Sequence, residues 1–65
     1  MKVIYYPTID VLSILFNTAP IAESSVSKPG VIMDYDKDGN LIGLEIIDAS
    51  VCIENPSSLE YAVKA

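Results

Sequence analysis

The chain lacks histidine and arginine and has a single cysteine, Cys52, among its 65 residues. One cysteine excludes a disulfide within the chain, and without histidine it leaves too few ligands for a structural zinc site. The lysines, at positions 2, 28, 37 and 64, are scattered, so the sequence has no basic patch that would hold a phosphate backbone. We therefore expect no metal, no cofactor and no nucleic-acid partner.

A long hydrophobic run is also lacking. The apolar run VLSILF, residues 11–16, is far shorter than the roughly 20 residues that span a bilayer. It also follows a polar turn, which is unlike the arrangement of a signal peptide. We therefore expect a cytoplasmic protein that does not enter the membrane.

What the chain does have is a high apolar content for its size. Hydrophobic residues make up 51% of the sequence, the mean hydropathy is +0.39 and the net charge is −5. A chain of this length forms a single domain, residues 1–65, and buries only about 60% of the surface that its unfolded form exposes. With disulfides and zinc excluded, oligomerisation is the remaining reinforcement, so we expect a homo-oligomer, a dimer or larger. The acidic balance also suits a basic protein partner.

Residues 2–16 have the pattern of a first β-hairpin, KVIYY-PTID-VLSILF. Both arms are rich in β-branched and aromatic residues, and the tetrapeptide between them has turn chemistry. Pairing Tyr5 with Leu12 leaves a four-residue loop and sets Val3 opposite Ile14. This register places the most apolar residues of both arms on one face.

Residues 31–47, VIMDYDK-DG-NLIGLEII, have the pattern of a second hairpin. Asp-Gly between two β-type runs is a strong signal for a two-residue type I′ loop. With Asp38 and Gly39 as that loop, Tyr35 pairs with Ile42 on an apolar face, whereas a slip of one residue inverts the facing of a strand. The other pairs are Lys37 with Asn40, Met33 with Leu44 and Val31 with Ile46.

The remaining segments are a connection and a tail. Residues 17–30 are rich in turn formers and predict an ordered connection, in which residues 21–24 form at most a short edge strand. The tail, residues 54–65, has a helical pattern that Asn55 or Ser57 caps. The sequence therefore predicts an α+β fold: a four-stranded antiparallel sheet of two β-hairpins with a short C-terminal helix.

The stretch DYDKDGNLIGLE, residues 34–45, has the spacing of a calcium loop. An EF-hand loop lies between two helices, whereas Pro29 and Gly30 forbid an entering helix and the run VIM favours a strand. In the hairpin register Glu45 is only a diagonal neighbour of Asp34, so the carboxylates do not surround one ion. We expect a hairpin rather than a calcium site, with carboxylates that hold a cation at most loosely.

Several elements taken together resemble a known family: PGV, DYD, DGN, GLEI and DAS, with PIAES and an N-terminal YY-P-x-x-D-x-L segment before them. Over about residues 1–50 the chain resembles the small proteins of the domain of unknown function 2283 family. The resemblance implies an antiparallel β-rich fold and no established activity. It also implies a likeness to antitoxin genes, which are short and often lie beside small toxin-like genes. Tyr6 and Ser13 depart from the usual family residues, Asp and Tyr, and the outward face of the first hairpin is more apolar than is usual.

The sequence offers no catalytic constellation. Cys52 has no histidine, lysine or arginine near it to favour a thiolate, so we expect a buried structural cysteine. Paired carboxylates need a pocket that raises one pKa, and a small sheet has little room for one, so we expect a solvated acidic patch. We expect Asp48 to cap the following turn through its side chain. The protein is therefore not expected to be an enzyme.

The second face of the predicted sheet is more apolar than a solvated face should be, so it is the candidate interaction surface. That surface comprises Ile4, Tyr6, Val11, Leu15, Ile32, Asp34, Asp36, Glu45 and Ile47. If the helix covers this face instead, the interface is the opposite, first face of the sheet, which carries Val3, Tyr5 and Leu12. The sequence thus predicts a small acidic interaction module, antitoxin-like, that binds a protein partner through its sheet. The alternative is a self-assembling structural protein whose homo-oligomer is the functional unit.

Overall fold

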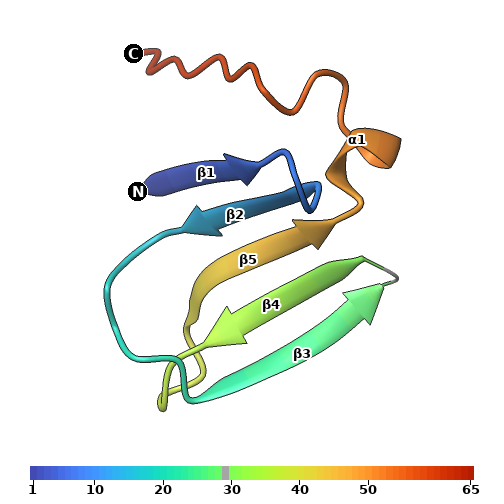
Figure 1. The fold of residues 1–65 in the computed structure, drawn as a ribbon. Coiled ribbons are helices and arrows are strands. Elements are labelled where there is room, and N and C mark those ends of the chain that lie inside the picture. Colours follow the sequence, from blue (N-terminus) through green and yellow to red (C-terminus); the bar gives the residue numbers. More distant parts are fainter. Residues whose placement is uncertain (29) are drawn as a thin grey trace.

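The computed structural model describes residues 1–28 and 30–65 and shows one antiparallel sheet of five strands, in the order β1-β2-β5-β4-β3 (Figure 1). The strands are β1 (Lys2–Tyr6), β2 (Val11–Leu15), β3 (Glu23–Lys28), β4 (Val31–Tyr35) and β5 (Leu41–Ile47). A short helix, α1 (Ala49–Cys52), follows the last strand. The broad prediction of an antiparallel sheet with a short C-terminal helix is confirmed.

The first hairpin has the predicted register. Tyr5 pairs with Leu12 and Val3 with Ile14, so the loop between β1 and β2 contains residues 7–10. This pairing agrees with side-chain alternation, because a one-residue slip would move the apolar side chains of one strand to the other face.

The second hairpin differs from its prediction near the tip. Asp36 N–H donates to Asn40 C=O at 3.0 Å, and Gly39, at φ +82°, is the glycine of a three-residue loop rather than of a two-residue one. Tyr35 consequently pairs with Leu41, and the predicted pair with Ile42 is wrong. At the tip, the pairing is therefore shifted by one residue from the predicted register. A β-bulge at Ile42 cancels this shift, so that the predicted pairs form further along β4 and β5.

The fifth strand was predicted only as a possible short edge strand at residues 21–24, and it was left out of the predicted four-stranded sheet. Strand β3 forms an edge of the sheet and pairs with β4, so the predicted count of four strands is wrong, and residues 23–28 are all strand. Its sequence, ESSVSK, is poor in the residues that favour strands, and all six of its residues are exposed. Pairing with β4 outweighs this weak local preference, since strand propensity depends strongly on context.

The helix lies earlier in the chain than predicted. It contains only four residues, 49–52, whereas residues 53–65 form no regular helix or strand. A helix of about ten residues is marginal unless an apolar face packs against something. Leu59 and Val63, which would have formed that face, are 67% and 84% exposed, so the predicted tail helix has nothing to stabilise it.

The centre of the sheet is the contact between β2 and β5, which joins the two hairpins. Leu12 pairs with Ile46 and Ile14 with Leu44. At Gly43 the strands approach so closely that a Cβ would lie 2.8 Å from the backbone oxygen of Ile14. Only glycine fits this position without displacing β2.

The molecule is a flat slab, with extents of 35 × 34 × 18 Å and a radius of gyration of 12.7 Å. A compact chain of this length has a radius of gyration of about 11 Å. Only Ile42 and Ala49 are fully buried apolar residues in the part of the chain that the structure describes. In residues 1–28 and 30–65, no helix has the length and apolar character needed to cross a membrane.

Candidate interaction surfaces

The register of the five strands divides the strand residues between two faces. We call one the mixed face because it carries apolar, hydroxyl and charged side chains. Its side chains on β1, β2, β4 and β5 are those of Lys2, Ile4, Tyr6, Val11, Ser13, Leu15, Ile32, Asp34, Glu45 and Ile47. The strand pairing thus brings together every residue of the predicted interaction surface except Asp36, which lies in the hairpin loop.

The centre of the mixed face is acidic. Glu45 is half-buried, and its neighbours across the two flanking strands are Ser13 and Ile32, neither of which has a positive charge. Asp34 is only 8% exposed and accepts a hydrogen bond of 2.6 Å from the Ser24 hydroxyl on the edge strand. Asp34 therefore already has a partner within the sheet, whereas Glu45 presents the carboxylate that is available to another molecule.

The apolar part of the mixed face is open to solvent. Tyr6 is 44% exposed and Ile47 is 41% exposed, at one end of the face where Val11 pairs with both. Val26 on β3 is 69% exposed and pairs with Ile32, so the apolar area continues to the edge of the sheet. No element of the described chain forms a second layer over these residues, since all extensive contacts between elements join neighbouring strands.

The other face we call the apolar face, because none of its members on β1, β2, β4 and β5 is charged, while Glu23 and Lys28 of the edge strand β3 pair with Tyr35 and Val31 at its border. Its residues are Val3, Tyr5, Leu12, Ile14, Phe16, Val31, Met33, Tyr35, Leu44 and Ile46. All are half-buried except Phe16, which is 39% exposed. A sheet face of this composition normally forms the core of a domain.

The C-terminal tail covers only part of the apolar face. It runs back past β1 toward the N-terminus, so that the two ends of the chain lie on the same side (Figure 1). A cavity of about 230 Å³ separates Leu59 and Tyr61 of the tail from Leu12 and Ile14 of the sheet. The tail therefore lies near β1 and β2 with a cavity between them, and no residue of β4 or β5 lines this cavity.

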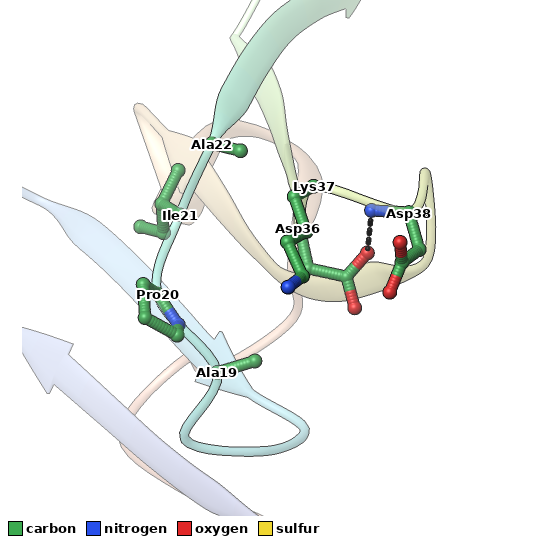
Figure 2. A pocket seen from close by; sticks show the side chains of 7 residues that line it. All are labelled: Ala19, Pro20, Ile21, Ala22, Asp36, Lys37 and Asp38. Carbon is green, nitrogen blue, oxygen red and sulfur yellow. Dashed lines mark hydrogen bonds between the residues drawn. The ribbon is translucent and has the colours of Figure 1, made fainter.

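A second pocket, of about 330 Å³, lies at the tip of the second hairpin, between residues 19–22 and residues 36–38 (Figure 2). The Asp36 carboxylate at its rim accepts hydrogen bonds from the backbone N–H groups of Asp38 and Asn40, both at 2.9 Å. The Asn40 amide donates a third bond, at 3.1 Å. These bonds, those from Asn40 first, lower the pKa of Asp36. Asp36 thus organises the loop, and strands flank it on both sides as the hairpin prediction required.

One structural residue was missed by the sequence analysis. Asp10, in the loop between β1 and β2, accepts hydrogen bonds from the Ser50 hydroxyl at 2.6 Å and from the Ser50 N–H at 3.0 Å. It also accepts one from the Tyr5 hydroxyl at 2.6 Å, and its backbone oxygen accepts the Ala49 N–H at 2.9 Å. Asp10 therefore joins the start of α1 to the first hairpin. Only the Asp of the family segment YY-P-x-x-D-x-L marked this position, with no indication of its partner.

The hydrogen bonds between Asp10, Ser50 and Tyr5 shift the pKa values of two side chains. The hydrogen bonds from Ser50, and next from Tyr5, lower the pKa of Asp10. The bond to Asp10 raises the pKa of Tyr5, because the phenol proton is held by the carboxylate. Such a bonded carboxylate with no histidine or lysine beside it has the chemistry of a structural anchor.

Two further predictions are corrected at the helix. Asp48 makes no side-chain capping bond, and its backbone is left-handed, at φ 53°. The Asp10 carboxylate, in the loop between β1 and β2, caps the helix instead by accepting a hydrogen bond from the Ser50 N–H. Cys52 is exposed rather than buried, because α1 ends there and no later segment covers it.

The chain thus has the fold of a small, mostly antiparallel β protein, with one open sheet layer and a short helix. The family model described as protein of unknown function (DUF2283) matches residues 2–50, and the chain belongs to this family. The match covers all five strands and the first helical residues and leaves out the tail. The resemblance recognised in the sequence is therefore confirmed. No curated protein and no solved structure matches the chain.

Proposed function

We propose that this protein is a small acidic interaction module of the cytoplasm, a binding protein rather than an enzyme, which binds a basic protein partner through the mixed face. In this antitoxin-like role, it would cover a functional surface of the partner and so neutralise it. The proposal extends to the chemistry of the partner: an apolar surface with a lysine or arginine near its centre.

The observation that carries the proposal is the position of Glu45. Glu45 lies in the middle of the mixed face, is half-buried, and has Ser13 and Ile32 as its neighbours on the flanking strands. A half-buried carboxylate without a cation is costly to cover with apolar surface alone but favourable to cover with a paired positive charge. The net charge of −5 adds long-range attraction for such a partner.

The test begins with capture of the partner. The tagged chain, at its native level in its own host, is purified at low salt, and bound proteins are identified by mass spectrometry. Association and dissociation rates of the purified pair are then measured at low and high salt for the wild type and for Glu45→Gln. We expect Glu45→Gln to slow association at low salt, to flatten the salt dependence and to speed dissociation, because both steering and a direct contact are lost.

Asp38→Asn is the matched control. It removes one negative charge, as Glu45→Gln does, but from the exposed tip of the second hairpin, away from the mixed face. It should affect association slightly and dissociation not at all. Equal rates for wild type and Glu45→Gln, or undiminished binding by Leu15→Lys, would show that the partner does not use this face.

A second candidate function is self-assembly, in which the homo-oligomer is the working unit. The observation in its favour is the surface area: the chain exposes 5039 Å². A folded monomer of this mass exposes about 4,000 Å². A structural role of this kind needs no heterologous partner, so a stable oligomer from a host in which the capture experiment finds no basic protein would favour it over the first candidate.

A further inference from the structure

The apolar face has no complete second layer of secondary structure over it. The sheet is a single layer in a slab 18 Å thick, and the tail lines a cavity on the apolar face together with residues of β1 and β2. Over the other strands, Val31, Met33 and Leu44 remain half-buried, and no helix or strand of the described chain forms a layer over them. A sheet normally buries such a face against a second layer, about 10 Å away.

The exposed area has the size that a stable dimer requires. The excess over a compact monomer of the same mass is roughly 1,000 Å² for each chain. A standard protein–protein interface buries about 800 Å² on each partner. The excess area that each chain exposes is therefore close to the area that each partner buries in a standard dimer interface.

The chemistry of the apolar face fits a second copy of this chain. In a two-fold dimer the same patch meets itself, so the patch must be self-complementary. Over β1, β2, β4 and β5 the apolar face has no charged residue, and its Tyr35 hydroxyl lies 3.7 Å from the Met33 sulfur, within the same face. The charged residues on this side of the sheet, Glu23 and Lys28, belong to the edge strand β3 and have opposite signs. The mixed face, by contrast, would bring two unpaired Glu45 carboxylates into one interface, which like-charge repulsion and desolvation disfavour.

We propose that two copies of the chain pack apolar face against apolar face, as a two-layered β-sandwich whose central contacts come from β4 and β5. The tail of each copy, over β1 and β2, then lies at the border of the interface. This surface is on the opposite side of the sheet from the mixed face. The dimer can therefore fail while the proposed function holds, and the reverse is also true.

The first test compares two neighbouring residues of β4 that point to opposite faces. Met33 belongs to the apolar face and Ile32 to the mixed face, and both are half-buried. Sedimentation equilibrium of the wild type at micromolar concentration should give a dimer. Met33→Lys should weaken self-association by about 100-fold or more, as expected for a buried anchor, whereas Ile32→Lys should remain a dimer.

The second test does not depend on whether Met33→Lys folds. Wild-type protein labelled with ¹³C is mixed with unlabelled protein, and isotope-filtered NOEs are recorded between the two copies. The Met33 methyl group should show NOEs to protons of the unlabelled chain, and the melting temperature should rise with protein concentration. A wild-type monomer at all concentrations would overturn the proposal. NOEs between copies from Ile32 or Leu15, with none from Met33, would also overturn it.

Discussion

The Asp10 carboxylate and Ser50 are joined by two hydrogen bonds, at 2.6 Å to the hydroxyl and 3.0 Å to the backbone N–H, across 40 residues of sequence. This contact fixes the position of α1 relative to the loop between β1 and β2. It replaces a local N-cap by a carboxylate from a distant element, which satisfies one of the free N–H groups at the helix start.

The first prediction concerns acid stability. The pKa of Asp10 in the folded protein lies below its ordinary value of 3.8, chiefly because of Ser50. The unfolded chain therefore binds the proton more tightly, so the contribution of Asp10 to stability is complete above pH 3.8 and is lost as the pH falls through the folded pKa. Ser50→Ala should raise the Asp10 pKa and flatten the acid side of a plot of melting temperature against pH.

Tyr5→Phe is the comparison variant for this prediction. The Tyr5 bond is the second cause of the lowered pKa, so its removal should raise the Asp10 pKa by less than Ser50→Ala does. The pKa values are measured by NMR titration of the Asp10 carboxyl carbon. A larger effect of Tyr5→Phe would mean that the helix contact is not the main partner of Asp10.

The second prediction concerns the close approach of β2 and β5. A Cβ at Gly43 would lie 2.8 Å from the Ile14 backbone oxygen, so Gly43→Ala must push the strands apart. We expect a loss of about 2 kcal/mol in the free energy of unfolding, typical of overpacking against a rigid neighbour. Gly39→Asn, in the hairpin loop, should cost less than about 1 kcal/mol, since asparagine tolerates positive φ. Urea unfolding measures both, and equal costs would contradict the steric explanation.

The third prediction tests the polar contact of the mixed face. Ser24→Ala removes the donor to Asp34, whose carboxylate is 8% exposed, and leaves that acceptor without its protein partner. We expect a loss of about 1–3 kcal/mol in the free energy of unfolding. Ser25→Ala, on the other face of β3, is the matched control and should change it by less than about 0.5 kcal/mol. If the two variants are equally stable, the hydrogen bond contributes nothing.

The fourth prediction concerns the tail. Leu59 and Leu12 line the same cavity, one from the tail and one from the sheet, but Leu59 is 67% exposed whereas Leu12 is half-buried. Leu12→Ala should lower the free energy of unfolding by about 2–3 kcal/mol, and Leu59→Ala by less than about 1 kcal/mol. A comparable loss for the two variants, measured in urea at one protein concentration, would show that the tail packs more firmly than its exposure indicates.

The sequence predicted what depends on alternation and missed what depends on contacts between distant segments. The first hairpin and the inner pairs of the second followed from period-two patterning, and so did the grouping of Ile4, Leu15 and Ile32 on one face. The bulge at Ile42 was not predictable from the sequence. Asp-Gly fits both a two-residue and a three-residue hairpin loop, and the choice between them depends on the whole sheet.

The other failures have the same physical origin. Strand β3 has little intrinsic preference for an extended conformation and is held by pairing with β4. The tail has a helical pattern, but a pattern yields a helix only where its apolar side finds a surface, and here Leu59 remains largely exposed. The role of Asp10 depends on Ser50, a partner that no local pattern could indicate.

The strand order has a consequence for how the chain folds. Strand β5, the last to be synthesised, lies in the middle of the sheet, between β2 and β4. Each hairpin alone is marginally stable in water, so the N-terminal hairpin has no stable partner until residues 41–47 are available. Closing the long loop between β2 and β5 is therefore the costly step, and folding should be a single late event that is slow for so small a protein.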